Sequence, residues 1–403
     1  MRLLTKIRNA AALGVKTGLY CVLRVLPLRD RVMFQCFHGW NYGDNTRAIL
    51  EELHRRSPQT ELLWLKDPQR DYALPPYVRA VNAQSPLART AAVCTSRVVV
   101  NTHRFEREVR KRKGQLFIET WHGGLGVKKV ENDMPNASVP EWMAGEIRNT
   151  CRLADLFLSN SRHLTGIYRR AFGYSGLVWR CGYPKNDVLH RGKDAARAAV
   201  RAHYGLPEDA KLLLYAPTFR DTIWKGRDDA WLFDIGEAEV LRALRKRFGG
   251  AWYLLKRLHP VMQGRAAQTA AQAGVLDATA YPDMQELILG SDAFLSDYSS
   301  GIFDAAEAGL PCFSYVPDAE EYAAERGVYY TPEELPFPFA KTRAELAERI
   351  EAFDETAYAA SRDAFFERTG LVQTDHAAAD VVRLILGRLN GETKLPEEIR
   401  NDD

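Results

Sequence analysis

The sequence predicts an α/β protein with two doubly wound domains that face a shared cleft. Short apolar runs alternate with stretches of helical periodicity, which is typical of parallel strands covered by helices on both faces. This alternation starts again after a polar helical stretch at 190–210. The length of 403 residues also favours two domains, because it exceeds what one ordinary core needs.

In the first domain, the strand candidates are apolar along their whole length, as expected for strands buried on both faces. They lie at 30–37, 61–66, 97–102, 115–121, 154–161 and 177–182. Between them, 45–56 and 164–173 have the three-to-four-residue periodicity of helices. Polar residues follow several of these strands, at the end where doubly wound sheets bind ligands.

The second domain repeats the pattern. Its strand candidates lie at 210–219, 251–260, 277–282, 292–300 and 310–316, with helices at 237–248 and 283–291. An amphipathic helix at 376–389 could pack back across the domains. We therefore expect four parts: an amphipathic segment (1–30), an N-terminal domain (31–195), a C-terminal domain (196–375), and a C-terminal helix with a polar tail (376–403).

The amino terminus combines positive charge with an apolar stripe. Residues 1–31 hold seven basic side chains and one acidic side chain, and apolar residues recur every three or four positions from Leu4 to Leu26. This pattern is typical of a helix that lies in an anionic membrane surface. The alternative is a helix packed on its own domain. No apolar run is long enough to cross a membrane, and Lys16 argues against a signal peptide.

Composition excludes several classes. The net charge of +3 arises from 55 basic and 52 acidic residues, a balance that argues against a nucleic-acid partner. The six cysteines are scattered and form no CxxC pair, so we expect reduced thiols and no structural zinc. No cluster of histidines or carboxylates has ligand spacing that implies a metal.

The stretch 291–315 carries the clearest ligand signal. An apolar strand runs into Ser299, Ser300 and Gly301, where a helix is expected to begin. Hydroxyls and free backbone N–H groups at a helix start can bind a phosphate. Serines at this position more often only cap the helix, but one cap needs one serine. The doubled serine with glycine favours phosphate.

The strand at 210–219 delivers Thr218, Arg220 and Asp221 to its carboxyl end. Arg220 could clamp a phosphate through two N–H groups. A surface ion pair between Arg220 and Asp221 is the alternative.

Two histidines stand at strand ends, one in each expected domain. His122 follows the run "GQLFIETW", and His259 follows "LLKR", next to Arg257. Either histidine alone could be structural. Because both would face the same cleft, together they suggest proton transfer beside bound phosphate.

Seven motifs, in order, resemble the CDP-glycerol:poly(glycerophosphate) glycerophosphotransferase family, which includes teichoic-acid primases and polymerases and related capsule enzymes. They are "FHGWNYGDNTRAILEEL", "WHGGLGVKK", "GYPKNDVL", "LYAPTFRD", "RLHP", "YPDMQELILGSDAFLSDYSSGIFD" and "EEYAAERGVYY". The resemblance extends from Val32 to Ile385. It implies a GT-B-type fold, meaning two Rossmann-like domains with the nucleotide held by the second.

The resemblance also implies the reaction. Glycerol phosphate would pass from CDP-glycerol to a hydroxyl of a lipid-linked acceptor, such as a polyprenyl-diphosphate saccharide or another glycan, with release of CMP. Such enzymes are peripheral proteins on the cytoplasmic face of the bacterial membrane and serve cell-wall or capsule synthesis. No cofactor is implied; Mg²⁺ stays an option.

Carried over by motif, His122 is the expected base and His259 the expected partner of the donor phosphates. The other donor-binding positions are Thr218, Arg220, Asp221, Arg257, Ser299, Ser300 and Gly301. On the acceptor side we place Asn45, Gly123 and Gly124. The family usually has Thr-Pro after "WHG", whereas this chain has Gly-Leu, so the acceptor stays open.

Two other readings remain. One keeps the fold but changes the donor to CDP-ribitol or a nucleotide sugar. The other is a non-catalytic, membrane-associated nucleotide-binding protein. Nucleotide release with each donor would separate the donors, and the non-catalytic reading predicts that His122→Ala leaves function in cells intact.

Overall fold

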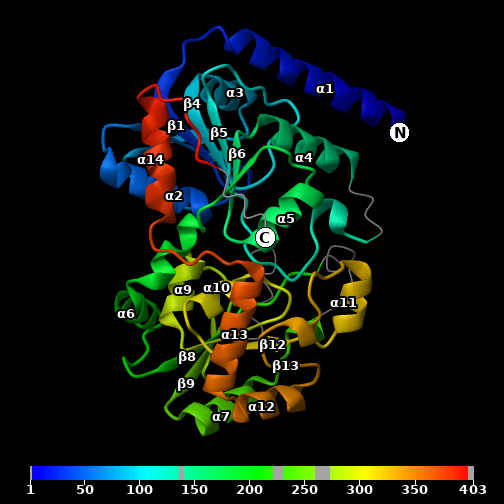
Figure 1. Ribbon diagram of the computed structural model, residues 1–403, viewed down its shortest axis with the longest axis vertical. Coiled ribbons are helices and arrows are strands. Elements are labelled where there is room, and N and C mark those ends of the chain that lie inside the picture. Colours follow the sequence, from blue (N-terminus) through cyan, green and yellow to red (C-terminus); the bar gives the residue numbers. More distant parts are fainter. Residues whose placement is uncertain (1, 136–139, 221–229, 259–272, 398–403) are drawn as a thin grey trace. The chain divides into compact units, whose positions relative to one another are not determined.

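The computed structural model describes residues 2–135, 140–220, 230–258 and 273–397, without the side chains of 2–12 and 230. The chain divides into two compact units, each with its own parallel sheet (Figure 1). Unit 1 comprises 1–122, 138–187 and 376–403, and unit 2 comprises 123–137 and 188–375. The chain therefore enters unit 2 directly after His122, returns to unit 1, and crosses again at 187/188 and 375/376.

The sheet of unit 1 has seven parallel strands in the order β3-β2-β1-β4-β5-β6-β7. The strands are β1 (Arg29–Gln35), β2 (Glu61–Lys66), β3 (Val78–Asn82), β4 (Ser96–Asn101), β5 (Leu116–Glu119), β6 (Leu156–Ser159) and β7 (Leu177–Arg180). Val32 of β1 lies opposite Leu62 of β2 and Val98 of β4, and all three are fully buried. Burial on both faces explains why these strands read as continuous apolar runs.

Six α-helices in the described part of unit 1 surround this sheet (Figure 1). They are α1 (Arg2–Leu23), α2 (Asp44–Arg56), α3 (Pro86–Thr95), α4 (Glu141–Leu153), α5 (Arg162–Arg170) and α14 (Ala377–Leu389). The last of them, α14, packs against α2 and β4, so the carboxyl end of the chain belongs to unit 1. Short 3₁₀ turns lie at Phe37–Gly39 and Pro184–His190.

Helix α1 has two different faces. Tyr20 is 1% exposed and joins the core of unit 1, while Val15 and Val22 are 69% and 65% exposed. The helix packs on α3 and also presents apolar side chains outward. Among the described helices, none is long and apolar enough to span a bilayer.

The sheet of unit 2 has six parallel strands in the order β10-β9-β8-β11-β12-β13. The strands are β8 (Lys211–Tyr215), β9 (Trp252–Lys256), β10 (Val275–Asp277), β11 (Ala293–Ser296), β12 (Cys312–Tyr315) and β13 (Phe339–Ala340). The described helices of this unit are α6 (Lys193–Tyr204), α7 (Glu237–Phe248), α9 (Met284–Gly290), α10 (Gly301–Glu307), α11 (Ala319–Glu325), α12 (Arg343–Glu351) and α13 (Glu355–Thr369). Further 3₁₀ turns lie at Glu131–Asp133, Ala230–Phe233 and Pro332–Glu334.

Several elements differ in detail from the prediction. The edge strand β3 was not predicted, because exposed Arg79 and Ala80 break its apolar run. The strand expected at 277–282 lies at Val275–Asp277, since a turn follows in which the Thr279 N–H donates to the Asp277 side chain at 2.8 Å. The strand expected at 292–300 ends at Ser296.

Each sheet has one point where the strand order reverses. In unit 1 this switch lies between β1 and β4, and in unit 2 between β8 and β11. Ligands of doubly wound folds bind at the carboxyl ends of the strands beside such a switch. A ligand site is therefore expected at the carboxyl ends of these strands, after Gln35 and Asn101 in unit 1 and after Tyr215 and Ser296 in unit 2. We call each of these places the switch edge of its unit.

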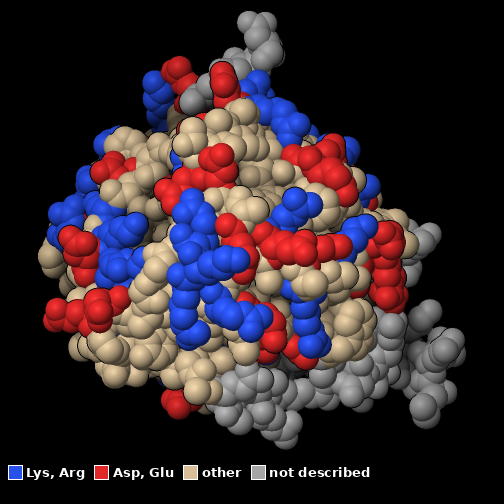
Figure 2. Space-filling model, turned by 90° about the horizontal axis from the view of Figure 1, so that it is seen from below, with Lys and Arg blue, Asp and Glu red and all other residues tan. Residues whose placement is uncertain are grey.

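The charged surface is mixed. On the face shown in Figure 2, Lys and Arg side chains are interspersed with Asp and Glu side chains. This view agrees with the near balance of 55 basic and 52 acidic residues in the sequence.

Candidate active site

His122 lies at the switch edge of unit 1, directly after β5. Its Nδ1 is 2.9 Å from the carbonyl oxygen of Thr102, which follows β4. A carbonyl oxygen can only accept, so Nδ1 donates and, in the neutral ring, Nε2 carries the lone pair. This is the tautomer that a general base requires at Nε2.

The backbone that carries His122 bends sharply at Trp121, where φ is +54°. The Glu119 carboxylate is fully buried and accepts from the Trp121 N–H at 2.9 Å and from Asn101 Nδ2 at 2.7 Å. Burial raises the pKa of Glu119 well above its ordinary value, against the effect of these two donors. The Glu119 side chain therefore fixes the bend through these two hydrogen bonds.

Asn45 secures the other side of the same bend. Its Nδ2 donates to the Trp121 carbonyl at 3.2 Å, and its Oδ1 accepts from the Lys185 N–H at 3.1 Å. The residue is 0% exposed. Asn45 thus supports the predicted acceptor side from within unit 1.

Three imidazole rings lie in a row at this edge. The His103 ring centroid is 5.5 Å from that of His122 and 5.0 Å from that of His38. His103 also stacks on Trp121 at 5.9 Å. Burial, followed by the charge of His122, lowers the pKa of His103 well below its ordinary value, so this ring is neutral.

His38 differs from His103 in having a carboxylate partner. Its Nδ1 is 3.1 Å from Glu106 Oε1, which also accepts from Arg89 Nη1 at 2.9 Å. Burial alone would lower the pKa of His38, but the hydrogen bond and charge of Glu106 outweigh it and raise the pKa. Burial opposes ionisation of Glu106 as well, yet Arg89 and His38 lower its pKa to about 2.

In unit 2, the loop between β11 and α10 holds the predicted phosphate residues. Ser299 Oγ accepts from the Gly301 N–H at 3.3 Å, whereas Ser300, the N-cap residue of α10, makes no side-chain cap bond. One serine is therefore used in the turn, and the other is not used as a cap. Phosphate binding by these two serines stays a prediction.

Arg220 is buried, with 7% of its side chain exposed, and its guanidinium contacts two carboxylates. Nη1 is 2.8 Å from Asp297 Oδ2, and Nε is 2.9 Å from Asp318 Oδ2. The guanidinium also lies about 5 Å from the centres of the Tyr298 and Tyr322 rings. Burial would lower the pKa of Arg220, but Asp297 and Asp318 raise it above the ordinary value. Arg220 therefore links its own segment to those of Asp297 and Asp318. Asp297 also accepts a hydrogen bond from the Thr218 N–H at 2.8 Å.

Arg257 differs from Arg220 in its partners. Its Nη1 donates to the carbonyl oxygens of Ala278 at 3.0 Å and Tyr281 at 2.6 Å. In the described part of the chain, no carboxylate lies within ion-pair distance of Arg257. Burial lowers its pKa, and the charge of Asp283 only partly offsets this. Arg257 is thus a cation whose charge is not neutralised by a direct partner among the described residues.

Thr218 and Lys256, which lie near these arginines in the sequence, differ in whether their side chains have a polar partner. Thr218 Oγ1 is buried and has no hydrogen-bond partner among the described residues. Lys256, which precedes Arg257, is paired with Glu237 at 3.0 Å inside the unit. The predicted site residues Asp221 and His259 lie outside the described residues.

The segment after His122 is attached to unit 2. Gly124 is buried, Leu125 and Val127 belong to the core of unit 2, and Tyr329 N–H donates to the Val127 carbonyl at 2.6 Å. Gly123, which is half-buried, is the first residue of this segment.

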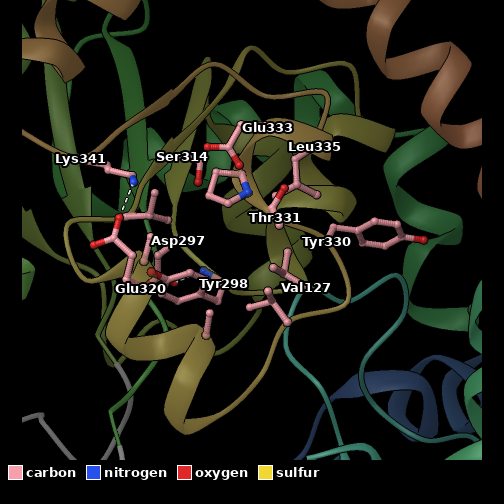
Figure 3. A pocket seen from close by; sticks show the side chains of 15 residues that line it. Val127, Asp297, Tyr298, Ser314, Glu320, Tyr330, Thr331, Glu333, Leu335 and Lys341 are labelled. Atoms are coloured by element: carbon pink, nitrogen blue, oxygen red, sulfur yellow. Dashed lines mark hydrogen bonds and ion pairs between the residues drawn. The ribbon is translucent and has the colours of Figure 1, made fainter. Parts of the chain in front are cut away.

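Val127 also lines a cavity of about 190 Å³ in unit 2. Figure 3 shows Ser314 among its lining side chains and the Lys341–Glu320 ion pair at one side. Ser314 Oγ is buried without a hydrogen-bond partner among the described residues.

The sequence patterns did not indicate His38, His103 or Glu106 as site residues. A signal for His38 was present, because a His-Gly pair directly follows an apolar strand there, as it does at His122. Nothing in the spacing indicated that Glu106 would face His38. As for metals, no group of three or more histidine, cysteine or acidic side chains in the described ranges could hold an ion.

The fold and the polar groups at the two switch edges define the class of protein. Two parallel doubly wound units, each with polar groups at its switch point, form the GT-B-type architecture of nucleotide-dependent transferases. The chain belongs to the CDP-glycerol:poly(glycerophosphate) glycerophosphotransferase family, whose sequence pattern matches residues 19–387.

Individual relatives agree with this assignment. The chain is 28% identical over 400 residues to the teichoic acid poly(glycerol phosphate) polymerase of Bacillus subtilis (strain 168), covering 95% of this chain and 52% of that protein. It therefore spans about half the length of that polymerase. It is 27% identical to the teichoic acid glycerol-phosphate transferase of Staphylococcus aureus (strain NCTC 8325), covering 94% and 99%. Among solved structures, a variant of the wall teichoic acid polymerase TagF with CDPG is similar, with a TM-score of 0.80, 25% identity, and coverage of 96% and 97%.

Proposed function

We propose that this protein transfers glycerol phosphate from CDP-glycerol to a hydroxyl of an acceptor in teichoic-acid-type polymer synthesis, with release of CMP. Family membership and the names of the relatives support the donor and the product. The observation that carries the proposal is the His122 ring, fixed by Thr102 at the switch edge with its lone pair on Nε2.

In the proposed reaction, His122 Nε2 takes the proton of the acceptor hydroxyl. The acceptor oxygen bonds to the phosphorus that bears glycerol, and the bond from that phosphorus to the CMP oxygen breaks, so CMP leaves with the electron pair. Attacking and leaving oxygens lie roughly in line at phosphorus. The proposal requires the His122 edge and the donor edge to meet during turnover.

On the donor side, we assign the phosphates to the loop of Ser299, Ser300 and Gly301, with Arg257 and His259 as cations. Among the described residues, Arg257 has no carboxylate partner, and this supports the role, because a neutralised guanidinium attracts an anion only weakly. Arg220 then serves the donor indirectly, by holding the strand ends through Asp297 and Asp318. We assign no cofactor or metal to the reaction.

On the acceptor side, we assign a lipid-linked glycan, such as a polyprenyl-diphosphate saccharide, reached from the cytoplasmic face of the membrane. The exposed apolar side chains of α1, including Val15 and Val22, support contact with a lipid surface. Four basic residues of the same helix, Arg2, Lys6, Arg8 and Lys16, would favour anionic lipid.

The test is nucleotide release by the purified protein, as CMP from CDP-glycerol or CDP-ribitol and as UDP from UDP-sugars, each with a short lipid-linked acceptor. We expect turnover with CDP-glycerol and its loss in His122→Ala. His190→Ala is the control, since it also removes an imidazole, one that lies 3.0 Å from Glu307 in unit 2. Turnover with CDP-ribitol alone would replace the donor, and full activity of His122→Ala would remove the mechanism.

A further inference from the structure

The loop that carries His38 is held in an unusual backbone conformation. Phe37, His38 and Gly39 have φ values of +43°, +57° and +92° in succession. Of the five non-glycine residues with positive φ in the described ranges, four lie between Phe37 and Asp44 or at Trp121, around the same sheet edge. Such a conformation costs about 1–2 kcal/mol per non-glycine residue, so it persists only where surrounding contacts enforce it.

The contacts that enforce it also involve His122. Thr102 Oγ1 accepts from the Phe37 N–H at 3.3 Å, and the Thr102 carbonyl accepts from His122 Nδ1 at 2.9 Å. The Phe37 ring lies 4.8 Å from the His122 ring. One residue at the end of β4 therefore positions both histidines.

The partner of the His38 side chain is also held in place. Glu106 is fixed by Arg89, which in turn contacts Glu108 at 3.0 Å. Glu108 contacts Lys16 of α1 at 3.1 Å. Because the Glu106 carboxylate cannot move away without breaking its contact with Arg89, the His38 side chain keeps Glu106 as its partner at 3.1 Å.

We propose that His38 is a positioning residue for the transfer reaction, whose imidazolium, held by Glu106, keeps the neighbouring His122 ring in the unprotonated form that a base requires. The inference depends on the proposed role of His122 and adds a second histidine to it. Two ring-to-ring separations of 5.0 and 5.5 Å, through His103, place His38 within about 11 Å of His122. Like charges at this separation disfavour each other, so a charged His38 favours a neutral His122.

Other charged groups face the row from several elements. They are Arg89 from α3, Glu146 from α4, and Arg104 and Glu106 from the segment after β4. Burial raises the pKa of Glu146 to about 7, so this carboxylate is only partly ionised near neutrality. Arg89 contacts both Glu106 and Glu108, and the charges of Arg104 and His38 are among the causes that lower the pKa of His103.

The expected size follows from Coulomb's law. One unit charge at about 10 Å, the upper limit that the two centroid separations set, shifts a titration by about 0.3 to 0.6 pH unit with an effective dielectric constant of about 40 to 80. Removal of the His38 charge should therefore raise the titration midpoint of His122 by that amount.

The experiment is an NMR titration of the full chain with ¹³C-labelled histidine, in which His122→Gln identifies the His122 signal. In the wild type, we expect His122 to titrate at lower pH than His38. His38→Gln should raise the His122 midpoint by about 0.3 to 0.6 pH unit, and His38→Lys, which restores a cation, should return it to within about 0.2 unit of the wild type. His190→Gln, the control, should leave it unchanged.

Three outcomes would overturn the proposal: a wild-type His122 that titrates above His38, an unchanged midpoint in His38→Gln, or a raised midpoint in His38→Lys. The first needs no variant at position 38, so it applies even if His38→Gln fails to fold. The titration requires no substrate, so its result is distinct from a failure of CDP-glycerol turnover. With an active donor and acceptor, the acid limb of kcat/KM should shift with the midpoint.

Discussion

Replacement of Arg220 by methionine tests whether this residue holds unit 2 together or binds the donor. The side chains of Asp297 and Asp318 are 4% and 6% exposed, and both contact the Arg220 guanidinium. Removing the guanidinium leaves the two buried carboxylates without this cationic partner. Breaking a buried ion pair in this way lowers the free energy of unfolding by about 3–5 kcal/mol. With a urea m-value of about 2 kcal/mol/M, the unfolding midpoint of unit 2 falls by about 1.5–2.5 M.

The assay is urea unfolding followed by tryptophan fluorescence, together with calorimetric binding of CDP-glycerol to the folded protein. Lys246→Met is the matched control, because Lys246 also contacts a carboxylate, at 2.6 Å from Glu351, but is 69% exposed. Its midpoint should stay unchanged. Arg257→Met should show the opposite behaviour, with donor affinity lowered about tenfold or more by the loss of a charged phosphate contact and a smaller loss of stability.

One result would refute the reasoning. If Arg220→Met keeps the wild-type midpoint within about 0.3 M but no longer binds CDP-glycerol, then the guanidinium serves the donor directly. The two ion pairs would then contribute little to the stability of unit 2.

Four further predictions follow from the same geometry. His122→Ala should lower kcat with CDP-glycerol by about 10²–10⁴-fold and leave donor affinity within about twofold, because it removes proton transfer and no donor contact; a matching loss of affinity, seen by calorimetry, would contradict this. Ser300→Ala should raise the KM for CDP-glycerol by about three- to tenfold through the loss of one hydrogen bond, and an unchanged KM would argue against the phosphate loop. The double change Val15→Asp and Val22→Asp should reduce sedimentation with anionic vesicles without a change in unfolding midpoint, since both side chains are exposed; equal co-sedimentation would exclude this face of α1. His38→Gln should destabilise unit 1 most below about pH 6.5 and less as pH rises, because the folded-state pKa of His38 is raised and its stabilising charge is lost on deprotonation; urea midpoints at pH 6 and pH 8.5 that fall equally would contradict this.

The strands show how far the sequence carries the fold. Runs such as those of β1, β4, β8 and β11 are apolar on both faces, so their burial could be predicted without coordinates. β3 could not, because only two of its five residues are buried. The two residues of β13 are too few for any periodicity.

The amino-terminal helix shows a limit of pattern analysis. Its apolar periodicity predicted either a lipid contact or packing on the same domain. In the structure, Tyr20 faces the core while Val15 and Val22 face outward, so the helix packs on its own unit and still has an exposed apolar face. Periodicity locates a stripe, but it does not decide which neighbour covers each part of it.

The sequence by itself determined the two α/β units, the family, and the strand ends at which His122, Arg220 and Ser299–Ser300 stand. These depend on local periodicity and on motifs read in chain order. Only the tertiary structure decided the partners: Thr102 for His122, Glu106 for His38, and Asp297 with Asp318 for Arg220. These pairs join residues 20, 68, 77 and 98 positions apart, from different loops of the same sheet edge. The charge state of an imidazole or guanidinium depends on such distant neighbours and on burial, and neither is encoded in the spacing of residues along the chain.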